Sequence, residues 1–280
     1  MGIWKSNNLL RAILVFIVLF SGCSGEFDST VSEIPIKNPA PVREKNKIPV
    51  IHVFVALCDN ESQGIVPVPK HLGNGDDPKG NLYWGAAFGV ETFFTKSKLW
   101  ERLPDPEPPS VDVLQRIAFR HQKTGALLIA DAYRGRSIKN SLTDFLEAAS
   151  GNSVTGIKIE DTSLQINGGA DVIVYVGHNG LMDFRIEKPR ISEDPGERDS
   201  IVLACFSKKY FRALLTGTGT RPLLWTTNFM APEAYLLHDA LEGRLNGESG
   251  EQVRMRAAKA YARYQRITVE ASIGLLVTGW

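Results

Sequence analysis

The sequence predicts an α/β domain in which a mostly parallel sheet is flanked by helices on both faces. Five short, continuous apolar runs are typical of strands that are buried on both sides. Segments with helical spacing separate most of these runs, and this alternation favours a parallel sheet with helical crossovers. Of the 280 residues, 43% are hydrophobic and 22% are charged, which is the composition of an ordinary globular protein with a sizeable core.

The apolar runs and the helical spacing give the elements in order. The predicted strands are residues 50–57, 126–130, 172–176, 201–204 and 223–227. The predicted helices are residues 110–124, 137–149, 231–245 and 250–266. In the first of these helices, Val113, Leu114, Ile117 and Ala118 have the spacing of one helix face. Residues 59–99 are rich in Gly, Pro and Asn, so we expect a long surface loop at the end of the first strand.

The amino terminus has the pattern of an export signal. Lys5 and Arg11 precede the apolar run 12–20, which is too short to span a bilayer comfortably and is followed by Ser21-Gly22-Cys23. We therefore expect residues 1–22 to be a signal peptide. The stretch that ends at Cys23 also resembles a bacterial lipoprotein signal, in which the cysteine is acylated and becomes the first mature residue.

This resemblance implies a protein anchored by its lipid to a membrane of the bacterial cell envelope. Residues 23–48 lack apolar periodicity and are predicted to be the acylated cysteine and a flexible tether, followed by the α/β domain in residues 49–280. Two alternatives stay open: secretion or a periplasmic location with Cys23 unmodified, and a retained membrane anchor.

Charge and composition limit the partners. A formal net charge of +1 gives no overall field that would attract nucleic acid, so no nucleic-acid partner is predicted. No metal or other cofactor is predicted, because the remaining histidines do not have the spacing of metal ligands. These histidines are His52, His71, His121 and His238.

The cysteines beyond Cys23 are Cys58 and Cys205, which is too few for a disulfide scaffold. In an oxidising compartment these two thiols are candidates for a disulfide, which would disable Cys205 as a nucleophile. The oligomeric state is not determined by the sequence.

The candidate catalytic residues lie in two similar cassettes, each an apolar strand-like run that ends in a reactive side chain. The first predicted strand of the pair ends in Gly177-His178-Asn179-Gly180, and the second ends in Ala204-Cys205-Phe206-Ser207. Open α/β sheets bind ligands at the carboxyl ends of their strands, so an imidazole and a thiol at two such ends are expected to meet across a crevice. Lys208, Lys209 and the backbone amides of a following turn are expected to lower the pKa of the thiol. An activated cysteine nucleophile is the predicted result.

The pair of cassettes resembles the caspase, gingipain, legumain and metacaspase group of cysteine peptidases. The matching positions are His178 and Ala204-Cys205, and the resemblance follows the strand order over about residues 48–245. It implies a caspase-like fold, a His178/Cys205 dyad and an oxyanion hole formed by two backbone N–H groups. Here those donors are Asn179 and Cys205; the family has glycine in place of Asn179.

The resemblance implies a cysteine endopeptidase that cleaves a peptide or protein substrate at the cell envelope. Asp59, in the loop after the first strand, and Trp225, at the end of the fifth, are the predicted residues of the substrate pocket. An acid at position 59 would favour a basic substrate residue; the alternatives are a solvated loop carboxylate and simple packing of Trp225. Two other functions remain: an inactive binding protein with the same fold, and a thiol-dependent amidase or transpeptidase.

Overall fold

The computed structural model describes residues 46, 48–193 and 196–280. The predicted signal peptide, Cys23 and most of the predicted tether lie outside the described residues. The strands are β1 Val50–Ala56, β2 Trp100–Arg102, β3 Val113–His121, β4 Leu127–Tyr133, β5 Thr155–Ile159, β6 Thr162–Ile166, β7 Val172–Val176, β8 Arg198–Leu203, β9 Thr220–Thr226 and β10 Leu276–Val277. The α-helices are α1 Val90–Lys96, α2 Ile138–Ala149, α3 Ser207–Leu215, α4 Ala234–Leu245, α5 Gly250–Gln265 and α6 Val269–Leu275.

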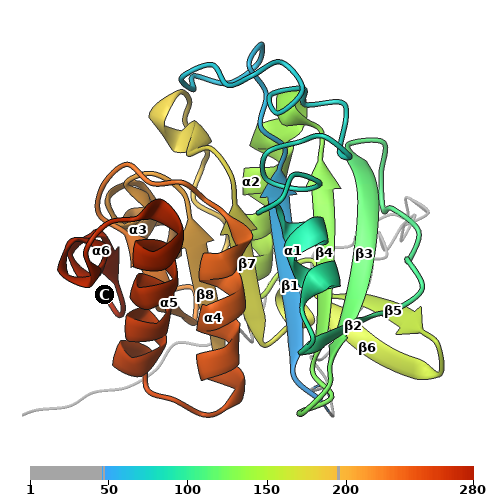
Figure 1. Ribbon diagram of the computed structural model, residues 1–280. Helices are drawn as coiled ribbons and strands as arrows, with labels where there is room; N and C mark the ends of the chain where they lie inside the picture. The colour runs from blue at the N-terminus through green and yellow to red at the C-terminus, as the bar shows by residue number, and fades with distance from the viewer. Residues whose placement is uncertain (1–45, 47, 194–195) are drawn as a thin grey trace, which may run out of the picture. The chain divides into compact units, whose positions relative to one another are not determined.

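Within the described residues, eight strands form one sheet in the order β10-β9-β8-β7-β1-β4-β3-β2 (Figure 1). The five central strands, from β9 to β4, are parallel to one another, whereas β2, β3 and β10 pair antiparallel. This arrangement confirms the predicted α/β class with a mostly parallel sheet, and it is consistent with a caspase-like fold. The chain order reverses between β1 and β7, which is where open α/β sheets place a ligand crevice.

Helices cover both faces of the sheet, as predicted. Every residue of β1 is buried, and alternate side chains enter two different cores. Val53 and Val55 pack in the core that also holds residues of α1, α4 and α5. Phe54 and Ala56 pack in the opposite core with residues of α2, α3 and the β5–β6 hairpin. Burial of apolar surface on both sides stabilises the centre of the sheet and fixes where its carboxyl edge lies.

One predicted helix is wrong. Residues 110–124 contain strand β3, which pairs antiparallel with β4 from Val113 opposite Tyr133 to Arg120 opposite Leu127. The apolar spacing that suggested one helix face arises because β3 is buried on both sides of the sheet. The predicted helices 137–149, 231–245 and 250–266 are confirmed as α2, α4 and α5.

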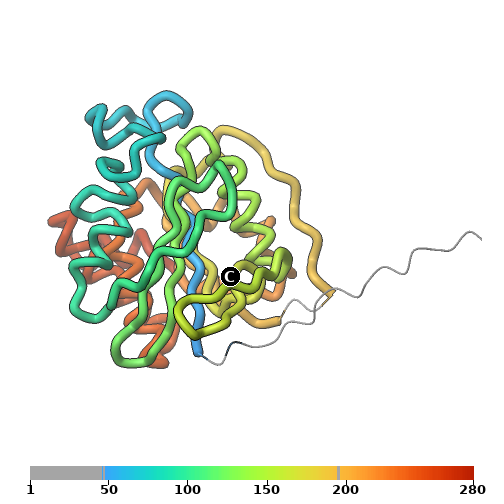
Figure 2. The backbone as a smooth tube through the Cα atoms, turned by 90° about the vertical axis from the view of Figure 1, so that its right-hand side faces the viewer, coloured from blue at the N-terminus to red at the C-terminus, as the bar shows by residue number. Residues whose placement is uncertain are grey.

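The connections at the carboxyl edge differ greatly in length. The segment after β1 is the long predicted loop; it also includes α1. After β7, a short 3-10 helix, η3 Gly180–Met182, is followed by a segment that runs down the outside of the domain toward β8 (Figure 2). After β8, α3 begins only four residues beyond the strand, at Ser207. This last connection holds Cys205 close to the end of the sheet.

Candidate active site

The strands β7 and β8 bring the two predicted catalytic residues to neighbouring strand ends. These strands pair in parallel from Val172 opposite Asp199 to Val176 opposite Leu203, a constant offset of 27 residues. The Gly177 N–H continues the pairing by donating to the Leu203 carbonyl at 3.2 Å. The same offset relates His178 to Cys205. The two residues therefore occupy equivalent positions just beyond adjacent parallel strands.

Gly177 sets the direction in which the chain leaves β7. Its φ of +150° is unfavourable for a residue with a side chain, and an added Cβ would approach the Ala56 carbonyl oxygen to 3.0 Å. The Tyr175 hydroxyl then donates to the His178 carbonyl at 2.8 Å. Backbone geometry and one buried hydrogen bond thus hold the His178 backbone in place.

Asp183 orients the His178 side chain. The imidazole is 8% exposed, and its Nε2 lies 2.7 Å from Asp183 Oδ2. The Gly64 N–H, from the loop after β1, donates to the same carboxylate oxygen at 3.2 Å. A carboxylate that accepts from Nε2–H leaves Nδ1 as the basic nitrogen. Asp183 is not among the site residues predicted from the sequence; the one signal for it is a carboxylate five residues after the candidate histidine.

Cys205 is half-buried, and its thiol bonds to the loop after β9. Its Sγ accepts from the Met230 N–H at 3.4 Å and donates to the Met230 carbonyl at 3.6 Å. Burial raises the pKa of the thiol, and hydrogen bonds from the N–H groups of Met230 and of Cys205 itself lower it by less. Among the described residues, no hydrogen bond joins Cys205 to His178.

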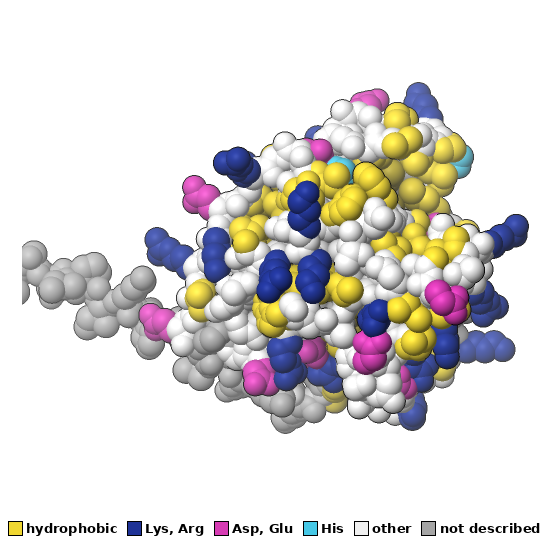
Figure 3. Space-filling model, turned by 90° about the vertical axis from the view of Figure 1, so that its left-hand side faces the viewer, with side chains coloured by type: hydrophobic (Ala, Val, Ile, Leu, Met, Phe, Trp, Pro, Cys, Tyr) yellow, Lys and Arg dark blue, Asp and Glu magenta, His cyan; other side chains and the backbone are white. Residues whose placement is uncertain are grey.

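The expected lowering of the Cys205 pKa by neighbouring lysines is therefore wrong. Lys208 Nζ lies 5.5 Å from the centre of the Trp225 ring, and Lys209 Nζ lies 5.2 Å from that of Tyr210. Figure 3 shows basic side chains standing among apolar ones on the side of the molecule that carries α6. Desolvation of the half-buried thiol outweighs any favourable charge effect, because the ammonium groups pack on aromatic rings instead of at the sulfur.

The turn after Cys205 is strained. Phe206 has a φ of +51°, in the left-handed backbone region that residues other than Gly, Asn and Asp rarely adopt. Its N–H donates to the Asn228 carbonyl at 3.0 Å, which holds the turn in place. Backbone strain of this kind concentrates at functional sites, where the surrounding structure maintains it. The strain therefore favours a functional role for the position of Cys205.

Asn179 joins the two cassettes. Its Nδ2 donates to the Cys205 carbonyl at 2.6 Å, and its Oδ1 accepts from the Leu181 N–H at 3.1 Å. The side chain is fully buried, so it clamps the ends of β7 and β8 together. Within the described part of the chain, no other residue accepts a hydrogen bond from the backbone N–H of Asn179 or of Cys205. These two N–H groups are the ones predicted to bind an oxyanion.

The two predicted pocket residues have structural partners. Asp59 is 8% exposed, and its Oδ1 accepts from the N–H groups of Glu61 and Ser62 at 2.9 and 3.2 Å. Trp225 is fully buried in the core and contacts the Trp280 ring edge-on. These contacts account for both side chains as loop and core elements. Their role in a substrate pocket stays a prediction.

Cys58 and Cys205 are both free thiols in the structure. Cys58 is fully buried at the end of β1, and burial raises its pKa to about 11, despite a hydrogen bond with Tyr83 that lowers it. Its N–H donates to Asn81 Oδ1 at 3.0 Å, and its carbonyl accepts from Asn81 Nδ2 at 2.8 Å. These bonds fix the start of the long loop, and the alternative of a Cys58–Cys205 disulfide is not observed.

A small cavity adjoins the loop that holds the Cys205 thiol. Its volume is about 290 Å³, and its walls include Asn228 and Phe229, directly before Met230. None of its lining residues is charged, and the exposed Phe229 ring contacts Phe206 at 4.8 Å between centroids. The cavity thus offers an uncharged surface near the candidate nucleophile.

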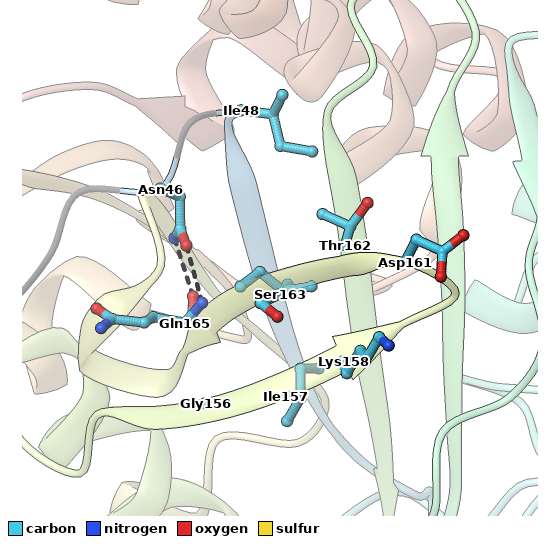
Figure 4. A pocket seen from close by; sticks show the side chains of 10 residues that line it. Asn46, Ile48, Gly156, Ile157, Lys158, Asp161, Thr162, Ser163 and Gln165 are labelled. Carbon is cyan, nitrogen blue, oxygen red and sulfur yellow. Dashed lines mark hydrogen bonds between the residues drawn. The ribbon is translucent and has the colours of Figure 1, made fainter.

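A larger cavity of about 920 Å³ lies against the β5–β6 hairpin (Figure 4). Asn46 borders it and mimics a strand residue, since its side chain both donates to the Gln165 carbonyl at 3.0 Å and accepts from the Gln165 N–H at 2.8 Å. The residues that line this cavity include no thiol or imidazole. The hairpin therefore offers no dyad comparable with the one at the carboxyl edge.

Two further findings concern only the described residues. They contain no group of three or more His, Cys, Asp or Glu side chains arranged to hold a metal ion. They also contain no helix with the length and apolar character needed to cross a membrane.

Comparison of the chain with protein-family models, with curated proteins and with solved structures finds no match.

Proposed function

We propose that the domain is a cysteine peptidase in which His178 is the general base and Cys205 the nucleophile. The observation that carries the proposal is the shared register of these residues beyond two adjacent parallel strands, together with the Asp183 carboxylate on His178 Nε2. This is the nucleophile, base and orienting group of acyl-transfer catalysis.

The reaction begins when the Cys205 thiol leaves Met230 and turns toward His178. His178 Nδ1 takes the thiol proton, and the sulfur attacks the carbonyl carbon of the scissile peptide bond. The N–H groups of Asn179 and Cys205 stabilise the negative oxygen of the tetrahedral intermediate. His178 then protonates the leaving amine, and water hydrolyses the thioester to release the acid and the free thiol.

The cavity beside Phe229 supports a preference for an uncharged substrate side chain. It lies one to two residues from Met230, which contacts the sulfur, and an extended peptide advances about 3.3 Å per residue. An uncharged side chain within roughly three residues of the scissile bond is placed to enter it. This preference differs from the basic one expected from Asp59, whose carboxylate is bonded to its own loop.

The proposed setting is the bacterial cell envelope, with the protein held to a membrane through a lipid on Cys23. The sequence pattern before Cys23 supports it. Metabolic labelling with a fatty-acid analogue tests this setting, with Cys23→Ser as the variant expected to lose the label. Label that remains on the Cys23→Ser protein would contradict acylation of this cysteine.

The test of catalysis uses the soluble domain and a mixture of denatured peptides, with new termini mapped by mass spectrometry. Cleavage is expected with the unaltered domain and is expected to disappear with Cys205→Ala. Cys58→Ala is the matched control, because it removes the other thiol of the domain and leaves the ends of β7 and β8 unchanged. Asp183→Asn is expected to slow cleavage at least about tenfold by releasing the imidazole from its orienting group. Cleavage that survives Cys205→Ala would refute the dyad.

A second function is favoured by the state of the thiol. Cys205 has a raised pKa, bonds to Met230 and has no hydrogen bond to His178 among the described residues. These features suit an inactive protein that binds a peptide at the same edge. If the domain is such a binding protein, no peptide is cut. The immobilised Cys205→Ala domain then retains the same peptides as the immobilised unaltered domain. A transpeptidase would instead join an added amine to the acyl product, which the same mass spectra would show.

A further inference from the structure

A serine, a histidine and an aspartate form a hydrogen-bonded chain where α1 meets α4. Ser97 follows α1 directly, and its Oγ lies 2.9 Å from His238 Nε2. The other ring nitrogen, Nδ1, lies 2.9 Å from Asp239 Oδ1. Both His238 and Asp239 are residues of α4. The order of contacts, hydroxyl to Nε2 and carboxylate to Nδ1, is that of a serine hydrolase triad.

The surrounding hydrogen bonds give each group the required role. The Leu99 N–H donates to Ser97 Oγ at 3.1 Å, so the hydroxyl proton of Ser97 is free to point at His238 Nε2. With Asp239 accepting from Nδ1–H, Nε2 is the basic nitrogen of a neutral imidazole. The base therefore faces the hydroxyl that it would deprotonate.

The histidine is held in this orientation by aromatic rings. His238 is 12% exposed, and Phe93 and Phe94 meet it edge-on with centroids 5.4 and 5.6 Å away. Both phenylalanines are in α1, the helix that Ser97 directly follows. The same helix thus positions the nucleophile and packs the base, which is the rigidity that a catalytic pair requires.

A cavity of about 410 Å³ opens onto this pair. Ser97 and His238 line it together with Phe88, Phe93, Lys96 and Tyr264. Phe88 is 38% exposed and meets Tyr264 edge-on with centroids 5.2 Å apart. Aromatic walls of this kind favour an aromatic group that stacks on them. The volume is sufficient for one substituted ring.

The backbone N–H of Lys98, the residue after the serine, is the candidate oxyanion donor. In the described residues, no acceptor takes the backbone N–H of Lys98, and in many serine hydrolases the N–H of the residue after the nucleophile binds the oxyanion. Lys96 is part of the cavity wall and places a positive charge nearby.

We propose that Ser97, His238 and Asp239 form a second hydrolytic site, separate from the Cys205 site, for aryl esters of short carboxylic acids. His238 Nε2 takes the Ser97 hydroxyl proton while Oγ attacks the ester carbonyl carbon. The bond from this carbon to the phenolic oxygen breaks, and His238 returns the proton to the leaving phenol. Water, deprotonated by the same nitrogen, then hydrolyses the acyl-serine to give the acid and the free hydroxyl.

The test uses the full chain with Cys205→Ala, so that no Cys205 activity contributes. The protein is treated with an aryl fluorophosphonate, the modified residue is mapped by mass spectrometry, and release of phenol from phenyl acetate is followed in parallel. We expect covalent modification of Ser97 and hydrolysis that Ser97→Ala removes. Thr95→Ala is the matched control: it removes an exposed hydroxyl two residues away and is expected to change neither readout.

His238→Gln is expected to reduce the rate of Ser97 modification by roughly 100-fold, because the general base is lost while the polar contact with Ser97 is kept. The thermal unfolding temperature of each variant is measured, and only variants that unfold at the temperature of the parent protein are compared. A folding defect is then not mistaken for a loss of catalysis. Absence of modification at Ser97, or a rate unchanged in His238→Gln, would overturn the proposal. Neither result bears on peptide cleavage at Cys205.

Discussion

His52 and His178 belong to two regions of the same sheet, the buried centre and the carboxyl edge, and they differ in how fully they are bonded. His52 Nε2 lies 3.1 Å from Asp131 Oδ2, and its Nδ1 accepts from the Asn167 N–H at 3.2 Å. For His178 the structure gives a partner at Nε2 and, within the described residues, none at Nδ1.

The surroundings explain the difference. Asp131 is buried and also accepts two hydrogen bonds from Arg116, at 2.6 and 2.7 Å, so the network around His52 is closed. Asp183, beside His178, is 35% exposed and stands at the surface end of the site. A fully bonded histidine stabilises a fold, whereas one with an unbonded nitrogen at a strand end is available to move a proton. The next four experiments test the buried central network and the residues at the strand ends, from the largest expected effect to the smallest.

Exchanging each histidine for glutamine should separate the two roles. His178→Gln is expected to lower the rate of peptide cleavage by about 100- to 10,000-fold, because the general base is lost. His52→Gln is expected to lower the free energy of unfolding by about 1–3 kcal/mol, since Asp131 loses a buried partner, and to leave the cleavage rate per folded molecule unchanged. Cleavage kinetics and urea unfolding of both variants measure this. If both variants lost cleavage rate and unfolding free energy to a similar extent, the two histidines would not have the different roles proposed for them.

Removing the guanidinium from the central network should be costly. Arg116→Met is expected to lower the free energy of unfolding by about 3–5 kcal/mol, because it leaves the buried Asp131 carboxylate without its main partner. The matched control is Arg120→Met, which breaks the exposed pairs with Glu160 and Glu101 and should cost at most about 1 kcal/mol. Urea denaturation of both variants gives the comparison. Equal costs would mean that the central network is no more important than a surface pair.

Asp131 should also control stability in acid. Burial raises its pKa, but hydrogen bonds from Arg116 and His52 outweigh burial and hold the pKa below its ordinary value. In the unfolded chain the carboxylate takes up its proton at about pH 3.9. Its contribution is therefore complete above that pH and is lost as the pH falls toward the lower pKa of the folded state. Unfolding free energy measured from pH 6 downward should fall less steeply in Asp131→Asn; an identical slope would contradict this assignment.

The two thiols should differ in reactivity. Cys58 is fully buried with a pKa raised to about 11, whereas Cys205 is half-buried with a smaller rise caused by the same desolvation. Iodoacetamide is expected to modify Cys205 first, at a rate that increases with pH as thiolate forms, and Cys58 only after unfolding. Peptide mass mapping against time measures the order. Faster modification of Cys58 would show that the end of β1 opens more readily than the turn after β8.

The sequence predicted the parts of the fold that depend on local apolar runs. All five predicted strands form and pair in parallel, because continuous burial on both faces leaves a signal in the run itself. For strand β3 the sequence wrongly predicts a helix, because four apolar residues at helical spacing do not distinguish a helix from a strand buried on both sides. Its identity comes from pairing with β4, where Arg116 lies opposite Asp131.

The residues of the candidate site also fall into two groups, those that the sequence predicts and those that only the structure reveals. His178 and Cys205 could be predicted because each directly follows a buried strand, and parallel strands align their carboxyl ends at one edge. Asp183 and Met230 could not be predicted, because both lie in loops whose path is set by contacts with other segments. One such contact is the hydrogen bond from the Gly64 N–H to Asp183. The raised pKa of Cys205 depends on burial by those loops, which no local sequence pattern indicates.

By itself, then, the sequence determined the α/β class, the two cassettes and the amino-terminal signal pattern, all of which are written in short contiguous stretches. Only the tertiary structure decided that β3 is a strand, that Trp225 is core, that Asp183 orients His178 and that the Cys205 thiol bonds to Met230. The reason is physical: hydrophobic periodicity is a local property, whereas hydrogen-bond partners and desolvation depend on which distant segments come together.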